Sequence, residues 1–184
     1  MSTSASLRSG AEAQQAFRDV MAAVASPVAV VIALDGGRPH GTTVSAFAPL
    51  SLTPPMVPVS LDERSCLLAV VRRSGRFGVN VLGAHQADPA SVFARSGPDK
   101  FDGIDWLPSG GLPRLPDAAA SIAAEVDDCV DLGDHTVLLA HVTAAEPGEG
   151  PLKPLTYHRR SFGTRTPLGP VTVRHVEEGM GSRA

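Results

Sequence analysis

Apolar residues near the start of the chain recur with the spacing of an α-helix. The repeat places five residues on one helical face: Ala16, Phe17, Val20, Met21 and Val24. Ser9 followed by Glu12 forms a capping box, which predicts that the helix begins there. We expect Pro27 to end the helix, because the residue before a proline is disfavoured in the α conformation.

After this helix, short apolar runs alternate with turn residues, which is the pattern of antiparallel strands. Residues 28–34 predict a strand, Asp35-Gly36-Gly37 a hairpin turn, and residues 40–47 the strand that returns. Residues 56–61 predict a further strand, which Pro54-Pro55 separates from the previous one.

A second helix is predicted over residues 65–74, with Ser65 placed to cap its start and Gly75 to end it in the left-handed conformation. A strand over residues 77–82 follows. Residues 85–111 are rich in loop-forming residues, with one helical turn at residues 90–95, and they include the single tryptophan, Trp106. We expect this segment to pack over the rest of the fold.

Two long strands are predicted next, over residues 120–132 and 135–145, joined by a tight turn at Gly133-Asp134. A last short strand covers residues 155–158, and from Thr164 the chain is polar and punctuated by Gly and Pro. Strands outnumber helices, their connections are too short for repeated βαβ units, and no GxGxxG motif is present. The sequence therefore predicts an antiparallel barrel instead of a Rossmann sheet.

Length and charge narrow the function classes. A chain of 184 residues with 43% apolar residues fits one domain with a single core. We expect a cytoplasmic protein, because no apolar run is long enough for a membrane helix and the N-terminus lacks the apolar stretch of a signal peptide. A net charge of −3 without a basic run argues against nucleic-acid binding.

Cysteine and proline positions add two local expectations. Cys66 and Cys129 lie in apolar surroundings without a CxxC spacing, so we expect two buried thiols and neither a metal site nor a redox pair. Pro58 lies inside the strand predicted over residues 56–61 and has no N–H group to donate. We therefore expect an edge strand or a bulge at Pro58.

The strand over residues 40–47 is built from side chains too small to fill a core. One of its faces carries Gly41, Thr43, Ser45 and Phe47, and the other His40, Thr42, Val44 and Ala46. Either face leaves room for a flat ligand to approach backbone N–H and C=O groups. Phe47 itself is expected in the core.

Residues 60–65 mark the point where a strand ends and a helix begins. Free N–H groups of the first helical turn and the Ser65 hydroxyl point at one place, which attracts an anion, and Arg64 adds a guanidinium. We interpret Asp62 and Glu63 as complements of the helix dipole. The alternative is that Ser65 only caps the helix and Arg64 is solvated.

These segments resemble the flavin reductase-like family of FMN-binding split barrels, in particular the reductase component of two-component flavin monooxygenases. The resemblance rests on the residues Gly41, Thr43, Ser45, Phe47, Ser51, Leu52, Pro54 and Pro55. It continues in GRFGVNVL from Gly75, the Lys100-Phe101 pair, GDHT from Gly133 and YHR from Tyr157. Together these pieces cover about residues 14–163.

The resemblance implies a mainly β fold, an antiparallel split β-barrel of Greek-key type with a few short helices. The barrel domain would cover residues 11–163, with a flexible N-terminus at 1–10 and a C-terminal extension at 164–184. It implies an NAD(P)H-dependent flavin reductase (EC 1.5.1.-), which transfers a hydride from NADH or NADPH to FMN or FAD. It also implies a homodimer that supplies reduced flavin to a separate monooxygenase.

The resemblance assigns two groups of site residues. Flavin would be bound by Thr42, Thr43, Val44, Ser45, Ser60, Leu61, Arg64, Ser65, Arg76 and Phe101. Reduced nicotinamide would be bound by His135, Tyr157, His158 and Arg159. For Arg76, a surface arginine that starts a strand is an equal alternative. Phe101, with Lys100, could instead anchor a packed loop.

No Ser/His/Asp arrangement, metal-ligand spacing or P-loop is visible in the sequence. Hydride transfer to flavin requires no protein nucleophile, because the cofactors carry the chemistry. The main alternative is a split-barrel protein that binds flavin without reductase activity and acts as a carrier, a sensor or a haem-handling protein. His135 and the Tyr157 cluster distinguish the two, since a pure binder needs no nicotinamide platform.

Overall fold

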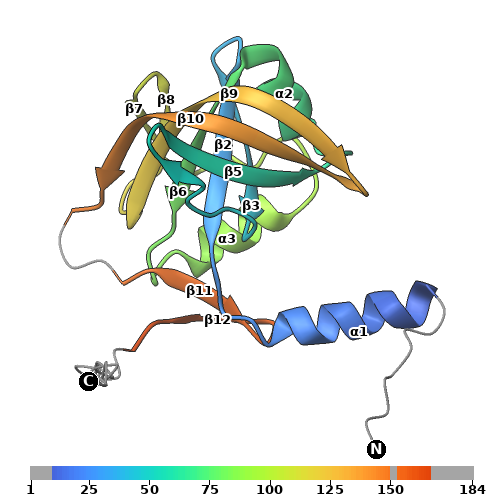
Figure 1. The fold of residues 1–184 in the computed structure, drawn as a ribbon. Helices are drawn as coiled ribbons and strands as arrows, with labels where there is room; N and C mark the ends of the chain where they lie inside the picture. Colours follow the sequence, from blue (N-terminus) through green and yellow to red (C-terminus); the bar gives the residue numbers. More distant parts are fainter. Residues whose placement is uncertain (1–9, 150–152, 167–184) are drawn as a thin grey trace, which may run out of the picture.

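The computed structural model describes residues 10–149 and 153–166, and most of their ordered elements are strands (Figure 1). The helices are α1 (Gly10–Ala22), α2 (Cys66–Ser74) and α3 (Ala87–Ala94). The strands are β1 (Ser26–Pro27), β2 (Ala29–Asp35), β3 (Arg38–Val44), β4 (Ser51–Leu52), β5 (Pro55–Asp62), β6 (Arg76–Val81), β7 (Leu107–Ser109), β8 (Leu112–Arg114), β9 (Ala120–Leu132), β10 (His135–Pro147), β11 (Leu155–His158) and β12 (Ser161–Thr164).

Seven strands form the barrel as one antiparallel sheet in the order β3-β2-β6-β9-β10-β5-β4. The chain beyond β3 joins the two ends of this sheet, because Phe47 forms an isolated bridge with Val59 of β5 and the Ser60 N–H donates to the Ala46 carbonyl at 3.0 Å. A three-stranded sheet, β1-β11-β12, lies beside the barrel, and β7 pairs with β8 (Figure 1).

The hairpins predicted from the sequence are confirmed. β2 pairs with β3 from Ala29↔Val44 to Asp35↔Arg38, around the turn at Gly36 and Gly37. β9 pairs with β10 around Gly133, whose φ of 63° lies in the left-handed region where glycine carries no Cβ penalty. α2 also ends as predicted.

Two predicted boundaries are wrong. The strand expected over residues 40–47 starts at Arg38 and ends at Val44, because beyond Val44 the chain leaves β2 and crosses to β5. α1 ends at Ala22, before Pro27, which lies in β1. Ser9 of the expected capping box lies outside the described residues.

The segment of residues 85–111 is more ordered than expected. It holds α3, which is longer than the predicted turn, and β7, whose hairpin with β8 turns at Gly110 and Gly111. Pro108 and Pro113 interrupt this hairpin in the sequence and weakened its strand pattern. Trp106 packs against the buried residues beneath α3, as predicted.

At Pro58, β5 pairs continuously on one side only, which agrees with the expectation of an edge strand. Its pairing with β10 is unbroken from Met56 to Asp62. The Met56 carbonyl accepts a hydrogen bond from the Leu50 N–H, and the Ser60 N–H donates to the Ala46 carbonyl. The backbone N–H and C=O groups of the even-numbered residues of β5 therefore point away from β10. The missing N–H of Pro58 therefore costs β10 no hydrogen bond. On that other side β5 meets only the two-residue strand β4 and a single bridge.

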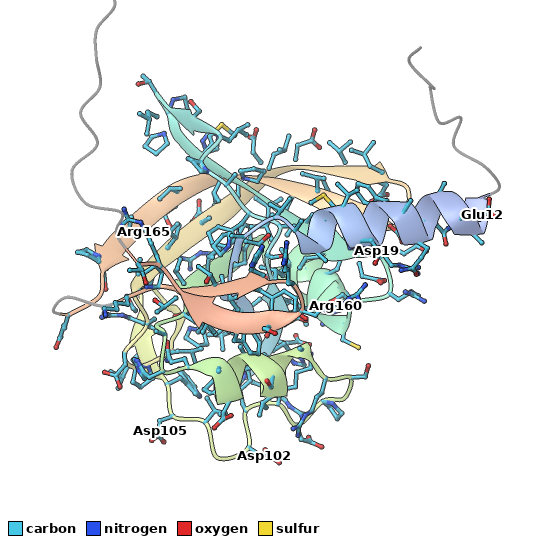
Figure 2. The ribbon with its side chains drawn as sticks, turned by 90° about the horizontal axis from the view of Figure 1, so that it is seen from below. Glu12, Asp19, Asp102, Asp105, Arg160 and Arg165 are labelled. Atoms are coloured by element: carbon cyan, nitrogen blue, oxygen red, sulfur yellow. The ribbon has the colours of Figure 1, made fainter. Side chains whose placement is uncertain are left out.

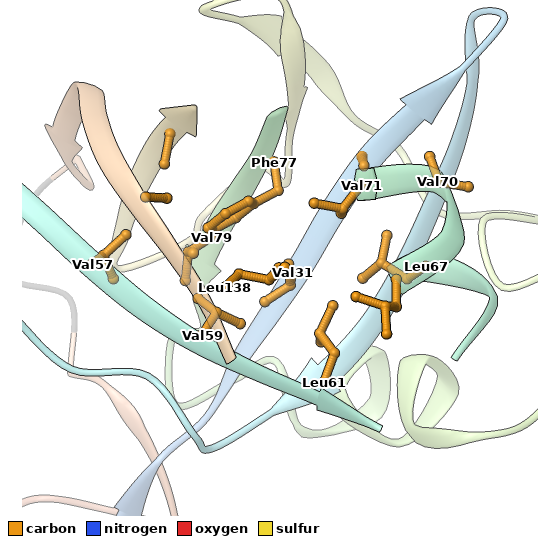
Figure 3. Close-up of a cluster of buried hydrophobic side chains, with 14 of the residues drawn as sticks. Val31, Val57, Val59, Leu61, Leu67, Val70, Val71, Phe77, Val79 and Leu138 are labelled. Atoms are coloured by element: carbon orange, nitrogen blue, oxygen red, sulfur yellow. The ribbon is translucent and has the colours of Figure 1, made fainter. Parts of the chain in front are cut away.

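Two groups of buried side chains form the core. The first fills the barrel between its sheet and α2 (Figure 3), and Val31, Val59, Leu61, Leu67, Val71, Phe77, Val79 and Leu138 belong to it. The second lies beneath α3 and includes Val30, Ile32, Leu82, Phe93, Leu115 and Leu155. Phe47 is half-buried against the first group, as expected.

The expectation of two buried thiols is wrong. Cys66 is exposed and Cys129 is half-buried. Cys66 is the first residue of α2, and the buried face of that helix begins only with Leu67 and Leu68. The helix thus turns its first side chain outward, although the sequence around it is apolar.

Among the residues that the structure describes, no helix has the length and apolar character needed to span a membrane. α1 extends from the barrel beside the three-stranded sheet (Figure 1).

Candidate functional site

A cavity of about 650 Å³ opens beside the start of α2. Three segments that are far apart in the sequence line it: residues 40–42 of β3, residues between Asp62 and Leu67, and residues between Ala94 and Phe101 after α3. Sites for small molecules and cofactors have volumes of several hundred Å³. The fold thus joins the polar strand to the strand–helix junction that the sequence indicated.

Ser65 is the N-cap residue of α2 and lines the cavity. Its φ of −66° and ψ of 124° are extended, and its side chain makes no capping hydrogen bond. The hydroxyl is therefore not taken up by the helix, contrary to the alternative that Ser65 only caps it. Because the first-turn N–H groups of a helix lack partners within it, the junction offers several donors to an anion.

Arg64 lies beside the cavity, where its side chain is 81% exposed, as the alternative of a solvated Arg64 stated, and pairs with Asp62. Its Nη2 donates to Asp62 Oδ2 at 2.8 Å, and its Nε and backbone N–H donate to Oδ1 at 3.0 and 2.8 Å. These hydrogen bonds lower the pKa of Asp62 well below the usual aspartate range. Asp62 ends β5, four positions before α2, so its interpretation as a complement of the helix dipole is wrong: its carboxylate positions Arg64.

The β3 wall of the cavity is partly occupied by its own hydrogen bonds. Thr43 Oγ1 donates to the Ala90 carbonyl at 2.7 Å, and Thr42 Oγ1 lies 3.5 Å from the Phe93 carbonyl. Val44 packs against the first core group, and Ser45 is exposed beyond the end of the strand. Of these four predicted flavin residues, Thr42 lines the cavity.

Lys100 and Phe101 close the cavity on its α3 side. Lys100 Nζ donates to the carbonyls of Gly41 and Phe93 at 3.1 and 3.0 Å, and burial lowers its pKa. The Phe101 ring meets Phe93 edge-on, with centroids 4.9 Å apart. A Cβ on Gly41 would lie 3.0 Å from the Phe93 ring, so a larger residue at this position would have to displace the ring. Lys100 therefore anchors the loop.

Two predicted residues at the end of β5 contribute little side chain. Leu61 is buried in the first core group, and the N–H of half-buried Ser60 is already bonded to Ala46. Neither belongs to the residues that line the cavity.

His135 lies next to the strand–helix junction but is not among the residues that line the cavity. As the first residue of β10 it pairs with Asp62, which lines the cavity. Its Nδ1 lies 2.7 Å from Asp134 Oδ1, and this hydrogen bond is the main cause of the lowered pKa of Asp134. The contact fixes the imidazole ring and leaves Nε2 to a ligand.

The structure does not bring the remaining predicted residues to the cavity. Tyr157, His158 and Arg159 lie in the β11–β12 hairpin, where Tyr157 contacts Phe162 edge-on at 5.3 Å. Arg76 follows α2 at its far end, and its guanidinium donates to the Gly110 carbonyl at 2.8 Å and lies 3.5 Å from Glu125. The surface-arginine alternative describes Arg76 in this chain.

Six polar residues that line the cavity were not selected as site residues from the sequence: His40, Asp62, Cys66, Arg95, Ser96 and Lys100. Lys100 was weighed only as part of a pair with Phe101. The signal that marks Arg95 is the Ser96-Gly97-Pro98 break after a predicted helical turn. His40 and Cys66 carry no local signal, because only the fold brings them together. No group of His, Cys, Asp and Glu suited to a metal ion occurs in residues 10–149 and 153–166.

The chain is similar to a known protein family and to several of its characterised members. A family described as "Flavin reductase like domain" matches residues 21–166. The reductase component of a 4-nitrophenol 4-monooxygenase/4-nitrocatechol 2-monooxygenase from Rhodococcus opacus is 38% identical over 82% of this chain and 80% of its own length. An NADH:riboflavin 5'-phosphate oxidoreductase from Streptomyces pristinaespiralis is 37% identical over 85% of this chain and 90% of its own.

Among solved structures, a nitrilotriacetate monooxygenase component B homologue from Mycobacterium thermoresistibile superposes with a TM-score of 0.84. It is 32% identical, and the superposition covers 92% of this chain and 96% of the other. The chain belongs to the flavin reductase-like family. This confirms the resemblance seen in the sequence and the mainly β, split-barrel fold that it implied.

Proposed function

We propose that this flavin reductase uses NADH to reduce FMN or FAD in the cavity at the start of α2. The observation that carries the proposal is that Ser65 and Arg64, which suit an anion, line the same cavity as the small residues Gly41 and Thr42. The NADH:riboflavin 5'-phosphate oxidoreductase among the relatives supports both the reductant and the flavin.

The residues present fit a flavin phosphate. A phosphate takes charge-assisted hydrogen bonds from a guanidinium and neutral ones from a hydroxyl and from helix N–H groups, and the junction at Arg64 and Ser65 supplies all three. Thr42 and its neighbours leave room for the flavin ring along β3. FMN and FAD share this part of the molecule, so the junction accepts either.

Bound flavin supplies the hydride acceptor, and the chain therefore needs no nucleophile of its own. The work of the residues is to hold and orient. The strand–helix junction fixes the phosphate end, Lys100 keeps the loop of residues 95–101 against β3, and Phe101 covers one side of the cavity. These walls limit access of water on the sides that they cover.

The nicotinamide of NADH is assigned to His135, with Tyr157, His158 and Arg159 as further candidates. His135 is favoured, because it pairs with Asp62 at the cavity edge and its ring is fixed by Asp134. An Nε2 that faces a ligand could bond the carboxamide or a ribose hydroxyl. NADPH remains the alternative reductant, and the reaction class is that of the flavin reductases.

The reduced flavin is supplied to a separate monooxygenase, as the name of the relative from Rhodococcus opacus indicates for that protein. The chain works as a homodimer, since one copy covers the open cavity only in part. We propose that it works in the cytoplasm, where NADH would be available to it.

Steady-state oxidation of NADH and of NADPH, each measured with FMN, with FAD and without flavin, tests this function. We expect NADH oxidation that depends on added flavin. A protein that binds FMN but oxidises neither nucleotide would be a flavin carrier or sensor, which is the competing function.

A further inference from the structure

α1 is held by its polar side to a hairpin of its own chain. Asp19 accepts a hydrogen bond from the Arg160 guanidinium at 2.9 Å, and the Ala22 carbonyl accepts the Arg159 N–H at 2.7 Å. Figure 2 shows Asp19 and Arg160 where the helix meets the β11–β12 hairpin. Both bonds lie in the second half of the helix and fix its direction.

The hairpin turn that makes these bonds is strained. Arg159 and Arg160 both have positive φ, 48° and 62°, which is the conformation of a type I′ turn. Glycine and asparagine are favoured there, and two arginines are costly. Each arginine also forms a hydrogen bond with α1. The strained turn therefore lies at the point where the hairpin holds the helix.

The opposite face of α1 is apolar and exposed. Phe17 and Val20 are 66% and 67% exposed, and Met21 and Val24 are close to half exposed. Phe17, Val20 and Met21 follow the i, i+3, i+4 spacing of one helical face, about half a turn from Asp19. Val24 continues this row in the turn just after the helix. In the part of the chain that the structure describes, no residue of α1 is buried. We call these four residues the α1 stripe.

The α1 stripe has the size of a patch that is often functional. At roughly 150–200 Å² for a whole large side chain, its exposed fractions amount to on the order of 400 Å², the size of patch that marks an interaction site. A C2 pair in which each copy covers the other's α1 stripe would bury about 1,600 Å² in all, which is the standard size of a stable interface.

The charged residues of α1, and the difference between obligate and transient partners, indicate what covers the α1 stripe. The charged residues of α1 are Glu12, Arg18 and Asp19, so the helix lacks the basic face that binds anionic lipid. A patch so apolar is typical of an obligate interface, since a transient partner would leave it exposed to aggregation for much of the time. A second copy is present whenever the chain is, and its barrel exposes apolar side chains such as Leu52 and Leu132.

We infer that α1 is an arm that docks its stripe on a second copy of the chain. This inference rests on the proposed homodimer and specifies its interface. The β11–β12 hairpin sets the direction of the arm through Arg159 and Arg160, and Phe17 and Val20 are its central contacts.

The test is the molar mass in solution, by light scattering on a sizing column over a dilution series. We expect the wild type to be a dimer at micromolar concentration and Phe17→Ser/Val20→Ser to dimerise at least about 100-fold more weakly, because two apolar contacts are lost from each arm. The matched control is Glu12→Ser/Arg18→Ser, which changes two residues of the same helix outside the α1 stripe and should remain a dimer.

Each other outcome contradicts a defined claim. A Phe17→Ser/Val20→Ser protein that dimerises like the wild type would contradict the arm and leave the homodimer standing. A monomeric wild type would contradict both, while NADH oxidation would still report separately on reductase activity.

Hydrogen exchange on the wild type needs no variant. The backbone amides of α1 should become more protected as the protein is concentrated. Protection that is independent of concentration would show that the chain covers its own helix, and it would overturn the inference even if the double variant fails to fold.

Discussion

Lys100 Nζ donates a hydrogen bond to the Gly41 carbonyl at 3.1 Å, across 59 positions of sequence. The same ammonium donates to the Phe93 carbonyl at 3.0 Å, so one side chain ties β3, α3 and the following loop together. Burial lowers the pKa of Lys100, yet both bonds favour its charged form. The wall of the cavity on this side depends on that contact.

Replacing Lys100 with Met should loosen the loop of residues 95–101. Because the loop shapes the cavity and Lys100 is already bonded to backbone carbonyls, FMN and riboflavin should both bind about tenfold more weakly. Titration of flavin fluorescence would measure the two affinities. Lys153→Met is the matched control, since Lys153 is exposed and outside the cavity lining. A loss confined to FMN would mean that Lys100 contacts the phosphate instead.

Much of the fold was predictable because its turns carry local signals. Gly36-Gly37 and Gly133 mark the β2–β3 and β9–β10 hairpins, and Gly75 ends α2. The β7–β8 hairpin was not predictable, because its prolines weaken the strand pattern. The length of β3 was not predictable either. It depends on where the chain leaves β2 and crosses to β5, and the closure of the barrel determines that point.

The candidate site was predictable where one local segment supplies it. The junction at Arg64 and Ser65 has a helix-start signature and does line the cavity. Arg95 and Lys100 come from a loop that long-range contacts bring to β3, and no periodicity reports such contacts. The pairing of Asp62 with Arg64 escaped for a similar reason, since an acidic residue before a helix has two plausible roles.

Replacing both Arg64 and Ser65 with Ala should weaken FMN binding by about tenfold or more, because charged and neutral hydrogen bonds to the phosphate are lost. Riboflavin has no phosphate and should bind almost as before. The ratio of the two dissociation constants is the measurement. If FMN and riboflavin lose affinity equally, these residues act through the shape of the junction.

His135→Ala should raise the KM for NADH about tenfold, which corresponds to one lost hydrogen bond to a partly buried partner. The dissociation constant of FMN should stay nearly constant. Asp134→Asn, which keeps a side chain beside the imidazole but removes its charge, should have a smaller effect of the same sign. Unchanged flavin reduction by NADH in His135→Ala would move the nucleotide site to Tyr157, His158 and Arg159.

Stability should fall in acid partly through Asp131. Its pKa is lowered by hydrogen bonds from Thr136 at 2.7 Å and Arg72 at 2.6 Å. A folded pKa below the unfolded value stabilises the fold above about pH 4, and this stability is lost as the pH falls through the folded pKa. Denaturant unfolding at several pH values should show that Asp131→Asn is less stable than the wild type at neutral pH and that the difference shrinks in acid.

Asp105→Asn is the control for that series, because Asp105 is exposed and makes no side-chain hydrogen bond within residues 10–149 and 153–166. A difference between Asp131→Asn and the wild type that is independent of pH would show that the carboxylate charge is irrelevant.

The most direct test of the central claim is the anaerobic reduction of FMN by NADH, followed by the loss of flavin absorbance. Wild type and Thr42→Ser should reduce FMN at similar rates. Thr42→Trp should place an indole where the flavin ring is proposed to lie and reduce FMN at least about 100-fold more slowly, while melting near the wild type. Equal rates in a folded Thr42→Trp protein would contradict the claim that this cavity is where the chain reduces flavin.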